Sequence, residues 1–348
     1  MKIFYGVQGT GNGHITRARE MAKAFAEIGD AEVTYLFSGR DASQYFDMDV
    51  FNNYQLMKGL TFHTKNGDVS YVKTAFETRP INFIKEVKSL DLSEYDLVIS
   101  DFEPVTAWAG KLSKKKVLGI GHQYAFQHRI PREGGDFIAE RVLKYFAPTD
   151  SCVGLHWHHF GQPILPPVIA SQHDALPLSI ANKIIVYLPF EDPAEVVKLV
   201  TPFEGYDFFI YTPAAVSSSS EHIKIKSLSR EGFRNDLLDC SGIISNAGFE
   251  LVSEALLWGK KIMVKPLHSQ LEQISNAAAL KQLGYGHIMN DLDAGLIGHW
   301  LMNPRRVRVT YPNVASILAQ WILDGMRPID DGFLEEIWGT VNVLQLNE

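Results

Sequence analysis

Short apolar segments alternate with amphipathic ones in both halves of this chain, and this alternation constrains its fold most. The apolar segments are typical of buried β-strands. The amphipathic segments between them have the periodicity and the capping residues of helices. Strands joined by helices pair in parallel, because a parallel connection needs a long crossover. The sequence therefore predicts an α/β protein with doubly wound parallel sheets in both halves. The expected strands are Lys2–Val7, Glu32–Phe37, Leu97–Ser100, Val117–Gly121 and Ser151–Trp157, then Lys183–Leu188, Asp207–Tyr211, Ile223–Lys226, Gly242–Ser245, Lys261–Val264 and Gly286–Met289.

A proline-rich segment, Gly161-Gln-Pro-Ile-Leu-Pro-Pro-Val168, separates the two halves. Proline cannot donate a ladder hydrogen bond, so we expect this segment not to continue a sheet but to begin a linker. We place an N-terminal domain at residues 1–165, a linker at 166–182 and a C-terminal domain at 183–312. Residues 313–348 are expected to form C-terminal helices.

Composition fits a two-domain enzyme and argues against nucleic acid as a partner. The chain has 348 residues, 46% of them hydrophobic and 21% charged, which is enough for two cores of ordinary size. Its net charge of −7 gives no reason to expect a polyanion as partner, since such binding needs a basic face. The two cysteines, Cys152 and Cys240, are too few for a disulfide framework and indicate a reducing compartment.

The sequence shows neither a secretory leader nor a membrane span. The chain starts with a predicted strand rather than a basic segment followed by an apolar core. No run approaches the roughly 20 apolar residues that cross a bilayer. We therefore expect a cytoplasmic protein without stable membrane insertion, and leave peripheral attachment to a membrane open.

The stretch from Ser245 to Gln273 has the clearest functional pattern. The strand before it runs into a turn that contains Gly248, and a helix follows from Phe249 to Trp258. Gly248 lets a ligand approach the backbone, and the helix end offers unpaired N–H groups and a positive dipole. Such a helix end suits a phosphate group.

Polar side chains in this stretch suit a ribose and a sugar. Glu254 lies about a turn and a half into the helix, where its carboxylate can accept two hydroxyl hydrogen bonds, as from a ribose. A second helix, starting near Ser269, presents Glu272 and Gln273, which suit sugar hydroxyls better than a metal. A nucleotide diphosphate joined to a sugar needs this set of groups. An ordinary strand–turn–helix of a parallel sheet is the alternative.

The loop after the first strand, Gly9-Thr-Gly11-Asn-Gly13-His14, is the second informative feature. A dinucleotide fingerprint needs Gly where His14 stands, and strand two ends near Arg40 without the ribose-binding acid. Because Arg40 suits a 2′-phosphate, an NADP-dependent oxidoreductase remains an alternative. A phosphate-binding P-loop is excluded, since no Lys-Ser/Thr follows the last glycine.

His14, Asp101 and Glu103 are the candidate catalytic residues. His14 falls at a helix start, where the positive dipole end favours a neutral ring that can act as a general base or position a departing phosphate. Asp101 and Glu103 follow a buried strand, at the sheet edge where open α/β folds bind ligands. One of them can orient His14 or act as the base itself. Capping of a helix is the alternative explanation for each of these residues.

Both stretches resemble those of GT-B glycosyltransferases, in particular the inverting, family 28-like group with the peptidoglycan N-acetylglucosaminyltransferase and the plant galactolipid synthases. There a Ser-x-x-Gly turn, a helix Glu about six residues later and a Gln before an Asn-Ala pair hold the nucleotide sugar. The matching positions in this chain are Ser245, Gly248, Glu254, Gln273 and Asn276-Ala277. The chain differs from the group at Phe249-Glu250, where smaller residues are usual.

The resemblance implies a GT-B fold, in which two Rossmann-like domains face each other across a cleft. It implies that the helix around Val314–Leu323 returns to the N-terminal domain. It assigns donor binding to Gly13, Arg230, Ser245, Asn246, Gly248, Phe249, Glu254, His268, Glu272 and Gln273. On the acceptor side it places His122 and Gln123, which follow the strand Val117–Gly121.

We therefore predict an inverting glycosyltransferase that needs neither a metal nor another cofactor. It would move a sugar from a nucleotide-sugar donor, most simply a UDP-sugar, to an unidentified hydroxyl acceptor on a lipid, a glycan or a small molecule. Helix dipoles would stabilise the leaving diphosphate. The segment Asn52–Pro80, with Phe62, Tyr71 and Phe76, contains no motif that identifies the acceptor.

Two other functions and one metal site remain as alternatives. Gly13-His14-Ile-Thr-Arg17 also resembles the UDP-sugar hydrolase of pseudaminic acid synthesis, although Asp101-Phe-Glu-Pro104 does not match the Asp-His pair of that enzyme. A non-catalytic nucleotide-sugar-binding protein is the second alternative. His156-Trp-His158-His159 has a spacing that could hold a metal with Cys152, but an ordinary strand end is the commoner explanation.

Overall fold

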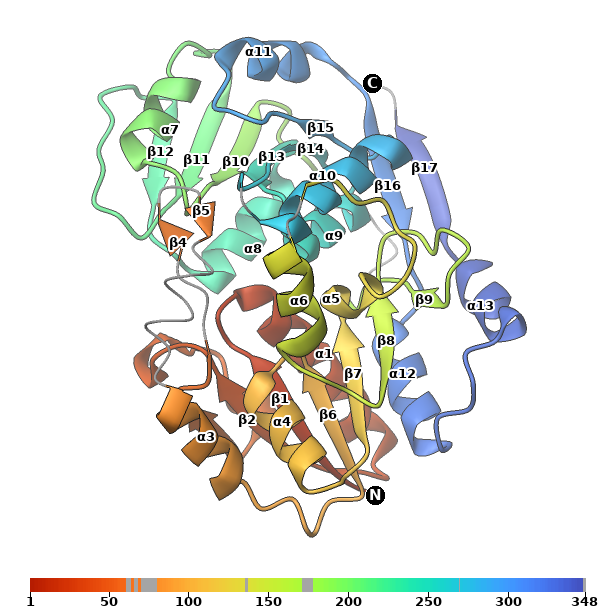
Figure 1. Cartoon of the computed structure of the whole chain (residues 1–348). Helices are drawn as coiled ribbons and strands as arrows, with labels where there is room; N and C mark the ends of the chain where they lie inside the picture. Colours follow the sequence, from red (N-terminus) through yellow and green to blue (C-terminus); the bar gives the residue numbers. More distant parts are fainter. Residues whose placement is uncertain are drawn as a thin grey trace.

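The computed structural model describes residues 1–60, 64–65, 68–69, 80–134, 137–170, 178–268 and 270–346. Two α/β domains lie one above the other in Figure 1, and the N-terminus belongs to the lower one. The predicted positions Phe62, Tyr71, Phe76 and Ser269 lie outside the described residues.

The N-terminal domain has a seven-stranded parallel sheet over the described residues, in the order β3-β2-β1-β6-β7-β8-β9. Helices flank both of its faces (Figure 1). The strands are β1 (Lys2–Gln8), β2 (Glu32–Ser38), β3 (Tyr54–Met57), β6 (Leu97–Asp101), β7 (Val117–Gly121), β8 (Ser151–Leu155) and β9 (Ile164–Leu165). The helices are α1 (Asn12–Ile28), α3 (Pro80–Ser89), α4 (Pro104–Leu112), α5 (His122–Ala125) and α6 (Phe137–Tyr145), with short 3-10 turns at Ala42–Gln44 and Asp49–Phe51. A small antiparallel pair, β4 (Thr64–Lys65) and β5 (Asp68–Val69), lies outside the sheet.

The C-terminal domain repeats this plan with a six-stranded parallel sheet, in the order β12-β11-β10-β13-β14-β15 over the described residues. Its strands are β10 (Lys183–Tyr187), β11 (Asp207–Tyr211), β12 (Ile223–Lys226), β13 (Gly242–Asn246), β14 (Lys261–Lys265) and β15 (His287–Ile288). Its helices are α7 (Pro193–Val200), α8 (Arg230–Asp239), α9 (Phe249–Leu257), α10 (Leu271–Leu283) and α11 (Ala294–Met302). The predicted pair of doubly wound parallel sheets is confirmed.

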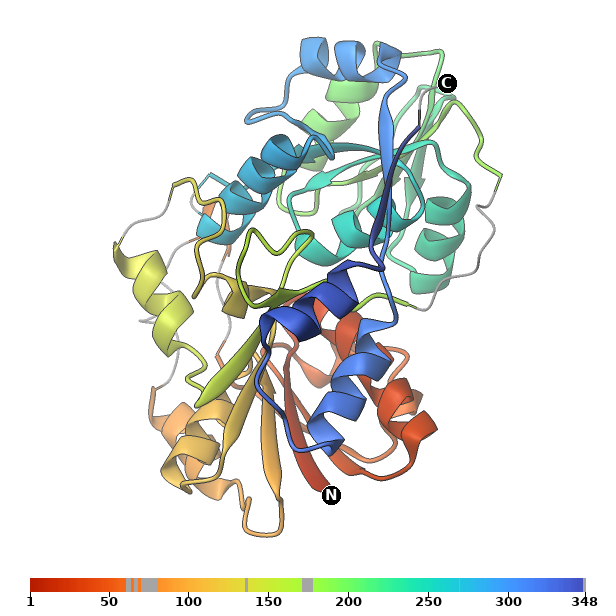
Figure 2. The ribbon, with the colours of Figure 1, turned by 90° about the vertical axis from the view of Figure 1, so that its right-hand side faces the viewer.

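The chain after the second sheet runs back and forth between the domains. An antiparallel pair, β16 (Arg306–Thr310) and β17 (Asn342–Leu346), lies beside the upper domain, while α12 (Val314–Leu323) and α13 (Asp331–Trp338) lie against the lower one (Figure 2). Helix α12 contacts α1, and the Trp338 indole donates a hydrogen bond to the carbonyl of Ile164. The sequence pattern does not reveal β17, because most of its residues are exposed.

The expectation that Gly161–Val168 cannot continue a sheet is wrong. Ile164 and Leu165 form β9, which pairs with β8, and both side chains are fully buried. Pro163 and Pro166 flank this strand on either side, so neither ring removes an N–H from its ladder. A short edge strand of this kind carries too few residues to show a periodic pattern.

The two domains are packed against each other by a shared apolar core. Trp157 follows β8 in the lower domain and Phe249 begins α9 in the upper one, and their ring centroids are 5.2 Å apart. They are 1% and 4% exposed. Packing of aromatic rings therefore holds the two domains together at the interface that contains the candidate site.

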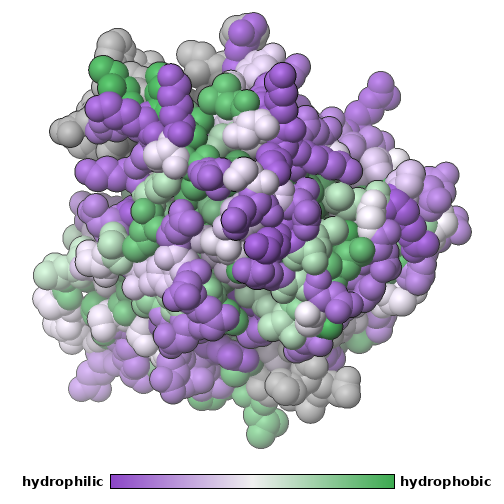
Figure 3. Space-filling view, turned by 90° about the horizontal axis from the view of Figure 1, so that it is seen from below, coloured by the Kyte–Doolittle hydropathy of each residue, from purple (hydrophilic) through white to green (hydrophobic). Residues whose placement is uncertain are grey.

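The surface of the lower domain is polar for the most part. Seen from below, hydrophilic residues cover most of this face and apolar residues appear between them in separate groups (Figure 3). None of the helices over the described residues combines the length and the apolar content that crossing a bilayer requires.

Candidate active site

The carboxyl ends of strands from both sheets meet at the domain interface. Asp101 is the last residue of β6, and Asn246 is the last residue of β13. Open α/β sheets bind ligands at this edge, because the loops and helix N-termini that follow the strands converge there. Hydrogen bonds that cross the interface include those of Arg17 with Glu250, His122 with Asn276, Gln123 with Glu272 and Trp157 with Ser253.

His14, Asp101 and Arg17 form a buried cluster on the N-terminal side. His14 Nδ1 lies 2.7 Å from Asp101 Oδ1. Arg17 donates to both carboxylate oxygens, from Nε at 2.8 Å and from Nη2 at 2.7 Å. His14 and Arg17 stand three positions apart on α1, so they share one face of that helix. Both side chains therefore extend from the first turns of α1 to the carboxyl end of β6.

The charges of this cluster determine its protonation. Burial opposes ionisation of Asp101, but Arg17 and His14 outweigh it and hold the pKa of this carboxyl below its usual value. An ionised carboxylate only accepts hydrogen bonds, so His14 Nδ1 donates in its contact with Asp101. Arg17 Nη2, which binds the same carboxylate oxygen, lies 3.0 Å from that nitrogen. Nε2 is then the basic nitrogen of His14. The pair has the form of an oriented imidazole base, with Asp101 as the group that orients it.

Glu103 is the cap of a helix in this structure. Its carboxylate accepts from the N–H groups of Val105 at 2.9 Å and Thr106 at 2.6 Å, and from the hydroxyl of Ser38 at 2.6 Å. It is fully buried, and burial raises its pKa. The sequence allowed helix capping for both acids. In the structure Glu103 is the residue that caps a helix, whereas Asp101 contacts His14. In this structure the carboxylate of Glu103 therefore holds the start of α4.

The N-terminus of α9 is open on the C-terminal side. Gly248 occupies its N-cap position without a side-chain cap, and no described atom lies within 4 Å of where a Cβ on Gly248 would stand. Ser245 Oγ and Asn246 Oδ1 are buried at the end of β13 without a hydrogen-bond partner among the described residues. Unsatisfied buried polar atoms are rare in folded proteins, and a bound ligand is one explanation for them. The predicted donor positions Ser245, Asn246 and Gly248 are thus brought together.

Glu254 lies further along α9 and is partly buried. No described residue makes a hydrogen bond or ion pair with its carboxyl group. Burial raises its pKa to about 7, although Arg234 and Arg230 oppose the shift. Arg230 itself pairs with Asp47 of the N-terminal domain at 3.1 Å. The Glu254 carboxyl is therefore available to a ligand between α8 and α9.

The remaining predicted donor residues have different surroundings. Gln273 is buried and accepts from the Leu267 N–H at 3.1 Å, so it holds the loop before α10. His268 is half exposed and lies 3.4 Å from Asp291, and no described contact joins it to the His14 cluster. Glu272 accepts from Gln123 Nε2 at 3.0 Å across the interface.

His122 is buried between the domains rather than facing a cleft. Its Nδ1 lies 2.9 Å from the Leu155 carbonyl and its Nε2 lies 2.7 Å from Asn276 Oδ1. Its ring stacks on Phe249 with centroids 3.9 Å apart. Burial lowers the pKa of His122. Both His122 and the predicted donor residue Phe249 therefore pack the interface.

Sequence reasoning missed Arg17 and Glu250 as members of the site. Arg17 Nη1 donates to Glu250 Oε1, which links the two domains beside His14. Gly13, predicted as a donor contact, lies against Glu250: a Cβ there would stand 2.6 Å from Glu250 Cγ. The spacing of His14 and Arg17 on one helix face was a signal that could have identified Arg17. Glu250 was visible only as a departure from the family pattern.

The histidines after β8 are engaged locally. His156 Nδ1 accepts a hydrogen bond from the Trp157 N–H at 2.8 Å, and the rings of His158 and His159 stack with centroids 4.6 Å apart. Cys152 Sγ lies 3.4 Å from Gln127 Oε1. Over the described residues, no three His, Cys, Asp or Glu side chains are grouped as metal ligands would be.

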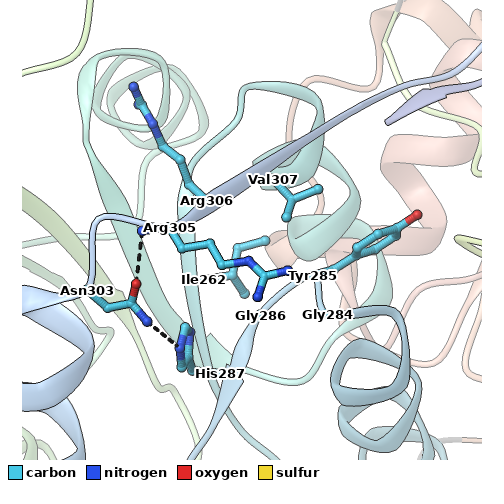
Figure 4. A pocket seen from close by; sticks show the side chains of 9 residues that line it. All are labelled: Ile262, Gly284, Tyr285, Gly286, His287, Asn303, Arg305, Arg306 and Val307. Carbon is cyan, nitrogen blue, oxygen red and sulfur yellow. Dashed lines mark hydrogen bonds between the residues drawn. The ribbon is translucent and has the colours of Figure 1, made fainter. Parts of the chain in front are cut away.

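A cavity of about 130 Å³ lies elsewhere in the C-terminal domain, between the end of α10 and the start of β16 (Figure 4). Gly284, His287, Asn303 and Arg305 are among its lining residues. Asn303 Nδ2 lies 3.2 Å from His287 Nε2. None of the residues predicted for the site lines this cavity, so it is separate from the cluster around His14.

The sequence matches glycosyl transferase family 1 over residues 1–304. The solved structure of the glycosyltransferase SnogD from Streptomyces nogalater is 14% identical, with 97% of this chain and 98% of that chain covered and a TM-score of 0.52. The spinosyn rhamnosyltransferase SpnG is 14% identical, with 94% and 98% covered and a TM-score of 0.58. UGT89C1 from Arabidopsis thaliana, solved in complex with UDP, is 10% identical, with 94% and 95% covered and a TM-score of 0.58.

No protein of curated function matches the sequence. The solved structures share the GT-B arrangement of two facing parallel-sheet domains with this chain. The family match spans most of the chain. This chain therefore belongs to glycosyl transferase family 1 and is a GT-B glycosyltransferase.

Proposed function

We propose that this glycosyltransferase transfers a sugar from a nucleotide-sugar donor, most simply a UDP-sugar, to a hydroxyl acceptor with inversion and without a metal ion. One observation carries the proposal: the His14–Asp101 pair lies across the domain interface from the open N-terminus of α9. The similar structure of UGT89C1, solved in complex with UDP, favours UDP as the nucleotide. The resemblance to the family 28-like group, carried by Ser245, Gly248 and Glu254, supports the same donor class.

The donor would bind mainly to the C-terminal domain. The first-turn N–H groups of α9 and the positive end of its dipole suit the diphosphate, with Ser245 Oγ and Asn246 Oδ1 beside them. The Glu254 carboxyl can accept both ribose hydroxyl hydrogens. The helix dipole and the nearby Arg17 guanidinium supply positive charge for the leaving group, which is the basis for proposing a metal-independent reaction.

The N-terminal side would activate the acceptor. His14 Nε2 takes the proton of the acceptor hydroxyl as its oxygen forms a bond to the anomeric carbon. The bond from that carbon to the diphosphate breaks on the opposite face, and its electron pair leaves with the nucleotide. Asp101 stabilises the imidazolium through Nδ1. Attack from the face opposite the leaving group inverts the anomeric centre.

A nucleotide-sugar hydrolase is the second candidate, with water as the attacking nucleophile. One observation favours it: Arg17, the last residue of the hydrolase-like motif Gly13-His14-Ile-Thr-Arg17, joins His14 and Asp101 in one cluster. The same base would then deprotonate water. Donor turnover without an acceptor, at a rate that acceptors do not change, would identify this function.

Calorimetric titration with UDP and other nucleoside diphosphates tests the donor site, and mass spectrometry of donor–acceptor mixtures tests the reaction. We expect UDP to bind and a sugar of inverted configuration to appear on an acceptor. Failure of every nucleoside diphosphate to bind at millimolar concentration would contradict the donor site. Transfer with retained configuration would contradict the roles given to His14 and Asp101.

A further inference from the structure

Glu250 reaches across the domain interface from the first turn of α9. It is the second residue of that helix, and its Oε1 accepts from Arg17 Nη1 of α1. Only 11% of its side chain is exposed, and its Oε2 is buried without a partner among the described residues. Gly13 gives it room, because a Cβ at that position would stand 2.6 Å from Glu250 Cγ. A buried carboxyl thus projects into the region where we place the diphosphate.

The charges around Glu250 are mostly negative. Burial raises its pKa to about 8, and Arg17 opposes the shift. The acids that add to the shift come from β6, α9 and α10, and they are Asp101, Glu254 and Glu272. His14 of α1 contacts both Asp101 and Arg17. An additional negative charge at this place would favour the protonated form of Glu250 further.

We propose that Glu250 competes with the donor diphosphate for Arg17: donor binding transfers Arg17 Nη1 from the Glu250 carboxylate to a phosphate oxygen, and the displaced carboxylate takes up a proton from solvent. This inference rests on the proposed function. It makes Glu250 a positioning residue that acts through Arg17. It also gives a physical role to the position where this chain departs from the smaller residues of the related group.

The geometry allows this exchange without moving Arg17. Nε and Nη2 of Arg17 remain bonded to Asp101 at 2.8 and 2.7 Å, so only Nη1 changes its partner. The same guanidinium then contacts the donor through Nη1 and the His14–Asp101 pair through Nη2. A carboxylate and a diphosphate at one helix end repel each other, and protonation of Glu250 removes this repulsion.

The sign of the pH dependence follows from this competition. Because the diphosphate raises the pKa of Glu250, the donor binds best where Glu250 is already protonated, below about pH 8. Affinity is lost as the pH rises through that value. With a pKa of about 8, the affinity ratio of wild type to Glu250→Gln falls about tenfold between pH 7 and pH 9. The ratio cancels the titration of groups that both proteins share, including Glu254.

Calorimetric titration of the full chain with UDP tests the proposal. At pH 8.5, titrations in two buffers of different ionisation enthalpy count the protons taken up on binding. The second phosphate ionisation, near pH 6, is complete at this pH. We expect proton uptake of up to about one by the wild type and none by Glu250→Gln. The matched control is Glu231→Gln, since Glu231 is the second residue of α8 and is exposed; it should behave as the wild type does.

The possible outcomes separate this inference from the proposed function. If no nucleotide binds to the wild type, the donor site itself is wrong. If UDP binds with no proton uptake and the affinity ratio stays constant from pH 7 to pH 9, the donor site stands and the competition is overturned. The wild-type proton count decides this point even if Glu250→Gln fails to fold. Circular dichroism of both variants checks folding.

Discussion

His14 Nδ1 lies 2.7 Å from Asp101 Oδ1, and 87 positions separate the two residues in the chain. The contact joins the first turn of α1, the helix that follows β1, to the carboxyl end of β6, which pairs with β1 in the parallel sheet. Arg17 binds the same carboxylate and keeps it ionised. A ring held in this way has a fixed orientation and a fixed basic nitrogen, which is what a general base requires.

Replacing His14 by alanine should lower turnover and leave nucleotide affinity nearly unchanged. In the proposed mechanism His14 acts only on the reacting centre, so we expect kcat to fall by about 10²- to 10⁴-fold. Steady-state kinetics and UDP calorimetry on the same preparation measure the two effects. Loss of UDP binding in His14→Ala would place His14 at the diphosphate and would leave Asp101 as the candidate base.

Asp101→Asn and Glu103→Gln should have different consequences. Asp101→Asn leaves buried Arg17 and His14 without their anion, so it should destabilise the fold by about 3–5 kcal/mol and also lower kcat. Glu103→Gln keeps the shape of the α4 cap but weakens its hydrogen bonds, at a cost of about 1–2 kcal/mol. Urea unfolding and turnover per folded molecule separate the two. Normal stability with lost activity in Glu103→Gln would restore Glu103 to the reaction.

Glu254→Ala should weaken UDP binding and leave the N-terminal domain folded. Loss of two hydrogen bonds to a charged acceptor corresponds to about 2–4 kcal/mol, or roughly 30- to 1000-fold in affinity. With a pKa of about 7, Glu254 becomes a better acceptor for ribose as the pH rises through neutrality. Calorimetry at pH 6 and pH 8 measures both effects. Unchanged binding and turnover in this variant would show that the donor pocket lies elsewhere.

The stability of the fold should decline as the pH rises toward 8, and Glu250→Gln should reduce this decline. The folded chain raises the pKa of Glu250 from 4.5 to about 8, so it binds the proton more tightly than the unfolded chain does. The resulting stabilisation is complete below pH 4.5 and is lost as the pH rises through about 8. One retained proton corresponds to about 1.4 kcal/mol per pH unit. Urea unfolding of both proteins at pH 5.5 and 7.5 checks this, and equal slopes would contradict it.

Gly13→Ala should disturb the interface, whereas Gly11→Ala should not. A methyl group at Gly13 collides with Glu250 Cγ, while a Cβ at Gly11 meets no described atom within 4 Å. We expect Gly13→Ala to cost about 1–3 kcal/mol and the double variant with Glu250→Ala to recover part of that loss. Thermal unfolding of the single and double variants measures the coupling. Strictly additive effects would show that the two residues do not interact.

The positions of most strands and helices could be predicted from the sequence, because strand and helix periodicities are local. The eleven predicted strands all occur, each within two residues of its expected bounds. The strands β3, β16, β9 and β17 and the small pair β4 and β5 were not predicted from the sequence. Of these, β9 has only two residues and β17 is mostly exposed, so neither carries a long apolar pattern. The turn that contains Gly248 could also be predicted from the local sequence. It places an open helix end after β13 whatever the rest of the chain does.

The sequence by itself determined two parallel-sheet domains, a glycine-rich turn before α1, and an open helix N-terminus with Gly248 at its cap. Only the tertiary structure decided which polar groups meet. It made Glu103 a helix cap, buried His122 against Asn276, and brought Glu250 to Arg17 from 233 positions away. Such pairings depend on the strand order and on how closely the domains approach. They also depend on burial, which forces each charged or polar group to find its partner away from water.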